Sequence, residues 1–389
     1  MKDRKIFCLN NISPLGTDLF REGYTLADCI ENTHGILVRS ADMHETEFPA
    51  TLRAIARAGA GVNNIPLDKC AEQGIVVFNT PGANANAVKE LVVAGLMLAS
   101  RDIAGGIEWV QNNRDDLNVA KDAEKAKKAY AGVEILGKKL GVIGLGAIGV
   151  MVANIALSLG MEVYGYDPYI SVGSAWSLRR GVKHCNSIDE IYENCDYITI
   201  HVPAMESTKK YINAEAIGKM KDGVRVLNFA RDILVDEDAM AAALESGKVA
   251  RYITDFPNEK SVRMVNTIVT PHIGASTEES ETNCAIMAVK ELQDYLDNGN
   301  ILHSVNFPDL DAGVCHTASR ITCLHKNTPG ILGQITTCAA EENINIANLS
   351  NKSRDKWAYT VLDLDERISD KALEKLMAID GMCRVRIVN

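Results

Sequence analysis

Three polar residues stand where predicted β-strands end, at positions that could support proton transfer and carboxylate binding. Arg231 follows the apolar run "VRVLNFA", Glu259 comes shortly after "ARYITDF", and His272 closes "NTIVTPH". Histidine exchanges protons near neutral pH, and the arginine fork can hold a carboxylate through two hydrogen bonds. Because open α/β sheets bind ligands at the carboxyl ends of their strands, we expect these three residues to form a catalytic site.

Each of the three residues also has an ordinary structural interpretation. Arg231 is followed by Asp232, Asp236, Glu237 and Asp238, and a surface ion pair with one of them would contribute only roughly 0 to 1 kcal/mol. A single histidine after a proline, or a single glutamate in a loop, is more often structural than catalytic. The functional interpretation is favoured because all three occur beside a dinucleotide-binding pattern.

The stretch "GVIGLGAIG" supplies that pattern, since it follows a predicted strand, opens a predicted helix and has G-x-G-x-x-G spacing. Such glycines permit a tight turn and a close approach of a pyrophosphate to the helix N-terminus. Asp167 can bind both ribose hydroxyls and repel a 2′-phosphate, which favours NAD over NADP. The alternative is a glycine-rich turn beside a surface aspartate. The expected cofactor contacts here are Gly144, Gly146, Ala147, Ile148, Gly149 and Asp167.

The elements that must position these residues form an alternating pattern. Residues 139–272 alternate short β-branched runs with helical segments, which indicates a parallel sheet with helices on both faces. Residues 4–80 repeat a looser version of the pattern, and the tail runs strand, helix, strand, strand, helix, strand. The expected fold class is therefore α/β, with two doubly wound parallel-sheet lobes of Rossmann type and a small α+β domain.

The expected domain boundaries follow the same pattern, and 389 residues are enough for two or three domains. We expect the following division: a substrate-binding lobe at 1–90 and 275–300, an NAD-binding Rossmann domain at 91–274, a linker at 301–318 and a small domain at 319–389.

Composition and charge exclude several classes of protein. The net charge of −10 disfavours nucleic-acid binding, which needs a basic surface. The ten cysteines contain no C-x-x-C pair, so we expect reduced thiols and no metal site. The N-terminus lacks the apolar run of a signal peptide, and the most apolar helical stretch, residues 91–99, is too short to span a membrane. These features predict a cytoplasmic protein that binds neither nucleic acid nor membranes.

The motifs together resemble the D-isomer-specific 2-hydroxyacid dehydrogenases. The resemblance runs from "GILVRS" through "ARAGAGVNNI", "NTPGANANAVKELVVAGLML" and "GVIGLGAIG" to "NFARDILVDEDAM" and "PHIGAST". It implies that His272 takes the hydroxyl proton while hydride leaves for NAD, that Glu259 bonds the other ring nitrogen, and that Arg231 holds the substrate carboxylate. The branch of the family with a similar tail oxidises D-3-phosphoglycerate to 3-phosphohydroxypyruvate, the first step of the phosphorylated route to serine.

The resemblance also implies further contacts. Around the nicotinamide it places Ala230, Arg231, Asp255 and His272, with Asp255 on the carboxamide. For the phosphorylated substrate it places Arg39, Arg57, Gly61 and Asn84. The sequence departs from the family pattern at Asp232, where glycine is usual, at Asn63, where aspartate is common, and at Thr254, where the carboxamide-binding aspartate usually stands.

The tail resembles an ACT domain, a regulatory module. In "LHKNTPGIL" and "NINIANL" the resemblance implies an L-serine site between paired modules, built from His325, Asn327 and Asn345, with the loop after the first strand facing the start of the second. The protein would then be a homo-oligomer, a dimer or a tetramer. The alternative is that these residues stabilise turns.

Two other functions are compatible with the same motifs. One is a dehydrogenase for an unphosphorylated acid such as glycerate or hydroxypyruvate. The other is a dinucleotide-sensing corepressor, which would also keep the Arg, Glu and His; the regulatory tail argues against it, because it suits feedback by an amino acid.

Overall fold

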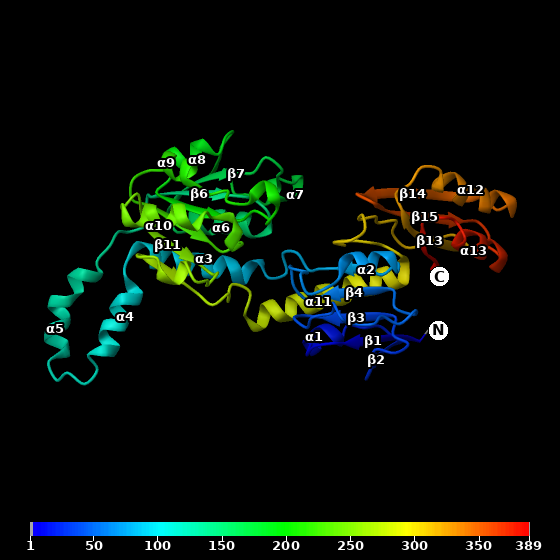
Figure 1. Cartoon of the computed structure of the whole chain (residues 1–389), viewed down its shortest axis with the longest axis horizontal. Coiled ribbons are helices and arrows are strands. Elements are labelled where there is room, and N and C mark those ends of the chain that lie inside the picture. Colours follow the sequence, from blue (N-terminus) through cyan, green and yellow to red (C-terminus); the bar gives the residue numbers. More distant parts are fainter. Residues whose placement is uncertain (1–2, 389) are drawn as a thin grey trace. The chain divides into compact units, whose positions relative to one another are not determined.

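The computed structural model describes residues 3–388, which divide into two compact units (Figure 1). The first unit comprises residues 3–84 and 278–388, and the second comprises residues 85–277. The chain therefore passes between the units twice, after residue 84 and after residue 277. Within residues 3–388 no helix has both the length and the apolar character needed to cross a membrane.

The second unit is built on a seven-stranded parallel sheet in the order β12-β11-β10-β9-β6-β7-β8. This is the Rossmann strand order with one strand added beyond the sixth. The strands are β6 (Lys139–Ile143), β7 (Glu162–Tyr166), β8 (Val182–His184), β9 (Tyr197–Ile200), β10 (Val224–Asn228), β11 (Val249–Thr254) and β12 (Thr267–Val269).

Helices cover both faces of this sheet with apolar side chains. On one face, the residues that pack on the strands come mainly from α3 (Ala85–Ser100) and α6 (Ala147–Ser158). On the other face they come from α8 (Asp189–Asn194), α9 (Ala214–Lys219) and α10 (Glu237–Glu245). The unit also contains α7 (Val172–Ser177) and the short turns η2 (Glu206–Thr208), η3 (Asp232–Leu234) and η4 (Ser261–Arg263).

An arm leaves this unit between α3 and β6 (Figure 1). It consists of α4 (Ile103–Asn112), α5 (Val119–Ala126) and the turn η1 (Lys127–Tyr130). Neither α4 nor α5 buries a residue, although α4 has an apolar side. The arm therefore exposes Ile107 and Leu117, which are 58% and 101% accessible.

The first unit contains a five-stranded parallel sheet in the order β2-β1-β3-β4-β5. Its strands are β1 (Arg4–Cys8), β2 (Tyr24–Ala27), β3 (Gly35–Val38), β4 (Ala54–Arg57) and β5 (Val76–Phe78), and its helices are α1 (Pro14–Thr17), α2 (Leu67–Glu72) and α11 (Glu278–Asn298). The helix α11 buries one stripe of apolar residues against the sheet, including Ala288 and Leu292. Both parallel sheets confirm the predicted fold class.

The last part of the first unit is a four-stranded antiparallel sheet, hereafter the C-terminal sheet, in the order β14-β15-β13-β16. Its strands are β13 (Ser319–Lys326), β14 (Ile346–Arg354), β15 (Trp357–Leu364) and β16 (Met382–Val388), and its helices are α12 (Ile331–Glu341) and α13 (Asp370–Met377). The predicted order of elements is confirmed.

Side chains of the C-terminal sheet alternate between two cores. Ile321 and Cys323 face the core shared with α12 and α13, whereas Leu324 and Tyr359 belong to the core that contains α11 and the five-stranded sheet. The segment 301–318, expected to be a linker, adds buried Phe307 to that second core. The C-terminal sheet therefore shares a core with the lobe that precedes it.

A buried ion pair lies at this junction. Arg320 is 0% exposed, and its guanidinium donates to both carboxylate oxygens of Asp363 at 2.6 and 3.0 Å. It also donates to the carbonyl oxygens of Asn298, Ala312 and Gly313, which connect the sheet to the end of α11 and the segment after it. Because every one of these acceptors is internal, the arginine has no access to water as a substitute partner.

We predict that Asp363→Ala lowers the free energy of unfolding by about 3–5 kcal/mol, because it leaves a buried guanidinium without its counter-charge. Urea denaturation measures this loss, with the exposed Asp380→Ala as a control that should change stability by less than about 0.5 kcal/mol. A loss as small as that of the control would mean that the ion pair does not stabilise the junction.

Candidate functional site

The glycine-rich loop joins β6 to α6 and has one position that the protein itself does not fill. Gly144 has a φ of +89°, and a Cβ there would lie 2.7 Å from the His201 carbonyl oxygen. A Cβ on Gly149 would lie 1.9 Å from the Gly144 carbonyl oxygen. A Cβ on Gly146, by contrast, would meet no atom within 4 Å. Close backbone contacts therefore explain why Gly144 and Gly149 are glycines. The open space beside Gly146, at the start of α6, fits a dinucleotide pyrophosphate.

Asp167 lies beside this loop, just after β7. Its carboxylate accepts hydrogen bonds from the backbone N–H groups of Leu145 and Tyr169, each at 2.8 Å. Each oxygen keeps further acceptor capacity, and the side chain is only partly buried. The predicted ribose contact therefore stands next to the predicted pyrophosphate site.

His201, a residue with no predicted role, follows β9 at the point where the strand order reverses. Its Nε2 lies 2.9 Å from the Thr199 hydroxyl, while its buried Nδ1 has no hydrogen-bond partner among the described residues. Burial lowers the pKa of His201 to about 4, so the ring is neutral at physiological pH. In the sequence, the only indication of this site is that "HVP" follows directly after a predicted strand.

Arg231 lies at the carboxyl end of β10, as predicted, and no described carboxylate pairs with it. Its exposed guanidinium donates only to the neighbouring Ala230 carbonyl oxygen, at 2.6 Å. The acids that follow it have other roles: Asp236 caps α10 and pairs with Lys210, and Asp238 pairs with Lys260. The ion-pair interpretation of Arg231 is therefore wrong.

The loop that carries Arg231 is held by Asn228, a second residue that sequence reasoning missed. Asn228 is 0% exposed; its side-chain amide donates to the Arg231 carbonyl oxygen at 2.8 Å and accepts from the Ala230 N–H at 3.1 Å. Asp232 starts η3 without a left-handed backbone, and its carboxylate accepts from the N–H of Ile233 at 2.8 Å. The loop therefore does not need the glycine that the family usually has there.

His272 lies in the loop after β12 with a φ of +56°, a conformation uncommon for residues other than glycine. The loop is held by Asp255, a carboxylate only 2% exposed. Asp255 accepts from the Thr270 hydroxyl at 2.6 Å and from the N–H groups of Ile273 and Gly274 at 2.9 and 2.7 Å. Asp255 was expected to bind the nicotinamide carboxamide, but in the structure its carboxylate is occupied in fixing the loop that carries the histidine.

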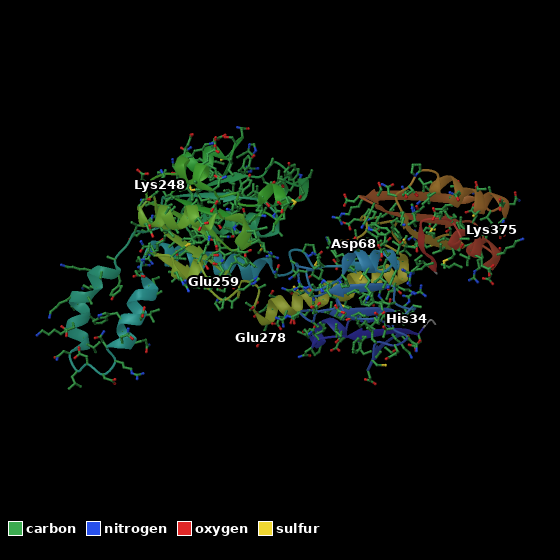
Figure 2. The ribbon with its side chains drawn as sticks, in the orientation of Figure 1. His34, Asp68, Lys248, Glu259, Glu278 and Lys375 are labelled. Atoms are coloured by element: carbon green, nitrogen blue, oxygen red, sulfur yellow. The ribbon has the colours of Figure 1, made fainter. Side chains whose placement is uncertain are left out.

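Glu259, labelled in Figure 2, lies on an exposed turn after β11. No hydrogen bond joins it to His272 within residues 3–388. The turn is fixed by Asn258, whose side chain accepts from the N–H of Ser261 at 2.9 Å, while the His272 ring packs edge-on against Phe256 at 5.0 Å. The expected Glu259–His272 hydrogen bond is therefore not formed, because an exposed carboxylate keeps its hydration while the ring packs on an aromatic face. Such bonds often tighten only in the substrate complex.

The predicted phosphate-binding arginines lie in the first unit, at the ends of the neighbouring strands β3 and β4. The Arg57 Nε donates to the Arg39 carbonyl oxygen at 2.9 Å. The Arg39 guanidinium forms an ion pair with Glu281 at 2.6 Å, and both side chains are more than 40% exposed. Asn10, which was not predicted, fixes the loop after β3, because its side-chain oxygen accepts from three successive N–H groups beginning at Arg39.

Gly61 and Asn84 also lie on loops that follow adjacent strands of this sheet, β4 and β5. These loops are joined by two hydrogen bonds, from the Asn79 side chain to the Ala60 carbonyl oxygen at 2.6 Å and from the Thr80 N–H to the Gly59 carbonyl oxygen at 3.1 Å. The predicted substrate residues of this unit therefore share one edge of the sheet.

The three predicted effector residues do not converge within one chain. His325 was expected in a loop, but it lies on β13, is 3% exposed, and has both ring nitrogens within 2.8 Å of internal partners. Asn327 lies next to Asp355, at the Trp357 end of β15, whereas Asn345 bonds Asp365 beyond the other end. Along an eight-residue strand with a rise of about 3.3 Å per residue, these ends are roughly 25 Å apart.

Comparisons with known proteins give the family of the chain. Residues 93–274 match the model for the D-isomer specific 2-hydroxyacid dehydrogenase NAD binding domain. D-3-phosphoglycerate dehydrogenase of Haemophilus influenzae is 34% identical over 383 residues, which cover 94% of this chain and 89% of the relative. The enzyme of the same name from Escherichia coli K12 is also 34% identical, over 93% of this chain and 88% of the relative. An NAD⁺-bound 3-phosphoglycerate dehydrogenase structure from Entamoeba histolytica aligns with a TM-score of 0.61 at 27% identity, covering 79% of this chain and 100% of its own. The chain belongs to the D-isomer-specific 2-hydroxyacid dehydrogenase family and carries its NAD-binding domain.

Proposed function

We propose that this protein catalyses the NAD-dependent oxidation of D-3-phosphoglycerate to 3-phosphohydroxypyruvate, the first step of phosphorylated serine biosynthesis. The observation that carries the proposal is the similarity along nearly the whole chain to relatives named for this activity. The presence of Arg231, Glu259 and His272 at the ends of adjacent strands supports it, since these side chains suit the reaction.

Each side chain has a defined task in the proposed reaction. NAD, when bound, accepts the hydride from C2 of the substrate. His272 removes the proton from the C2 hydroxyl and returns it to the carbonyl in the reverse direction. Arg231 holds the carboxylate and polarises the C2 oxygen, and its freedom from acidic partners leaves its donors available. Glu259 is a positioning residue, which would bond the ring of His272 once the ring leaves Phe256.

The phosphate of the substrate is assigned to Arg39 and Arg57. The Arg39–Glu281 ion pair is exposed, so it contributes only about 0–1 kcal/mol and can be exchanged for a phosphate. The loops at Gly61 and Asn84 would supply backbone N–H groups to the substrate carboxylate. The assay that tests the substrate compares NADH oxidation with 3-phosphohydroxypyruvate and with hydroxypyruvate. Equal rates would favour an unphosphorylated acid, and no turnover of either would favour a dinucleotide sensor.

We predict that His272→Asn keeps NADH binding but lowers turnover by about 10²- to 10⁴-fold, because it removes the general base. Asparagine is suitable because it accepts the positive φ at this position. Steady-state kinetics measures the loss, and a fluorescence titration checks cofactor binding. Turnover within tenfold of the parent would assign the base to another group.

We predict that Asp167→Ala weakens NADH binding and narrows the preference for NADH over NADPH. Asp167→Asn is the matched comparison, because it keeps an acceptor for the Leu145 N–H but removes the charge that repels a 2′-phosphate. Both variants should therefore lose discrimination, and the alanine variant should lose more affinity for NADH. Unchanged dissociation constants for both cofactors would place the ribose contact elsewhere.

The proposal extends to the assembly and location of the protein. A homo-oligomer, a dimer or a tetramer, is supported by the arm, because α4 and α5 contain no buried residue and the arm exposes Ile107 and Leu117. We place the protein in the cytoplasm, in keeping with ten cysteines that are all free thiols.

Feedback inhibition by L-serine is part of the proposal, in a form that the structure modifies. Asn327 and Asn345 lie at opposite ends of the C-terminal sheet, so one ligand can reach both types of side chain only where two sheets pair head to tail. Each site would then take Asn327 from one chain and Asn345 from its partner. His325, with both ring nitrogens engaged internally, would support the site rather than contact the ligand.

We predict that Asn345→Ala and Asn327→Ala each relieve inhibition by L-serine and leave uninhibited turnover nearly intact. A hybrid dimer of one chain of each variant has one intact site if the site is shared between chains, and no intact site if it lies within one chain. Calorimetry on the hybrid should therefore recover about half of the parent's L-serine binding. Absence of L-serine binding to the parent at millimolar concentration would remove the regulatory role.

A further inference from the structure

A cationic cavity lies in the first unit, away from every residue assigned above. It has a volume of about 290 Å³, and its charged and polar lining consists of Asp3, Arg4, His34, Arg53 and Arg386. These residues come from the start of β1, the turn before β3, the residue before β4, and β16 of the C-terminal sheet. His34 marks the region in Figure 2.

The arginines of the cavity are not equally compensated. Arg4 pairs with Asp297 and donates to the Tyr24 hydroxyl at 2.7 Å. Arg53, by contrast, makes no side-chain hydrogen bond or ion pair with any residue in the described part of the chain. Arg386 is 7% exposed, and its Nη1 is buried without a partner among residues 3–388.

Arg386 is held in place by uncharged groups. Its Nη2 donates to the carbonyl oxygens of Tyr295 and Leu296 at 3.4 and 3.2 Å, and its guanidinium lies 4.4 Å from the centre of the Tyr295 ring. These contacts orient the side chain without neutralising it. The same sheet contains a neutralised example at Arg320, where the buried guanidinium donates to both carboxylate oxygens of Asp363. A buried charge without a partner is costly, and a bound anion would offset that cost.

The remaining groups do not neutralise the cavity. Asp3 is the only described acid in the lining, and its carboxylate accepts from the Thr25 hydroxyl at 3.0 Å. Burial is the main cause that lowers the pKa of Arg53 to about 10, and the positive charges of Arg386 and Arg384 add to this effect. The Nδ1 of His34 accepts from the Lys5 N–H at 3.1 Å, so in the neutral ring the proton is on Nε2 and a donor remains.

We propose that this cavity binds a phosphoryl group, either as inorganic phosphate or as a phosphate monoester. Two uncompensated guanidiniums match the charge of about −2 that a phosphate monoester carries at neutral pH. Arginine forks suit phosphate oxygens, and donors from separate elements suit a tetrahedral anion. The volume lies near the lower end of about 300–1,000 Å³ seen for ligand sites, which fits a small anion.

The position of the cavity gives the bound group a structural effect. Arg386 belongs to the C-terminal sheet, whereas Arg53 and His34 belong to the turns of the five-stranded sheet. An anion between them would join the two sheets where positive charges otherwise repel each other. Binding should therefore stabilise the folded protein, because the ligand binds the native state and not the unfolded chain.

The test uses calorimetry and thermal unfolding of the full-length protein in a phosphate-free buffer. Inorganic phosphate and glycerol phosphate are the two probes, and they separate the free anion from the monoester. We expect at least one of them to bind the parent and raise its unfolding temperature. Arg53→Gln should weaken that binding by about tenfold or more, because it removes a guanidinium that can donate two charge-assisted hydrogen bonds. The affinity of Arg53→Lys should lie between those of the parent and Arg53→Gln.

Arg21→Gln is the matched control, because Arg21 is 74% exposed, does not line the cavity, and lies 3.8 Å from Asp297. It should bind the probes like the parent. Arg53→Gln should also unfold normally without phosphate, since its side chain has no described partner to lose. The proposal is overturned if neither probe binds the parent at millimolar concentration, or if Arg53→Gln binds as tightly as Arg21→Gln. The second result would assign the binding to Arg39 and Arg57 instead.

Discussion

Parallel pairing of strands is the constraint on which the rest of this molecule depends. In both parallel sheets each strand returns through a helix or loop, so the carboxyl ends of all strands meet at one edge. That geometry brings together residues far apart in the sequence, such as Arg231 and His272 in one sheet and Arg39 and Arg57 in the other. The functional loops need no sequence proximity, because the backbone ladders of the sheets align them.

Polar side chains with little or no exposure to water then fix the loops at these edges. Asn10 holds the loop after β3, Asn228 holds the loop of Arg231, and Asp255 holds the loop of His272. Each uses its acceptors on backbone N–H groups that have no strand partner, which satisfies groups that would otherwise be costly to bury. The candidate catalytic side chains Arg231, Glu259 and His272 can therefore stay exposed, because other residues hold the loops in place.

The C-terminal sheet follows a different principle, because its antiparallel strands place related residues at opposite ends. Asn327 and Asn345 are separated by the length of β15, so any ligand that needs both must be shared between two chains. The same sheet shares a core with the five-stranded sheet through Leu324 and Tyr359. In the proposed dimer, this shared core would connect the paired C-terminal sheets with the lobe that carries Arg39 and Arg57.

The sequence by itself determined the fold class, the dinucleotide loop and the candidate catalytic residues. Periodicity identifies parallel strands, and the glycine spacing at Gly144 and Gly149 reflects backbone contacts that leave no room for a Cβ. Tertiary structure alone decided which polar side chains already have hydrogen-bond partners inside the protein. Asp255 supports a loop, His325 lies inside a sheet, and Arg386 is buried without a counter-charge. These roles depend on partners from distant segments, and a local pattern of residue types carries no information about which acceptors lie within hydrogen-bond distance.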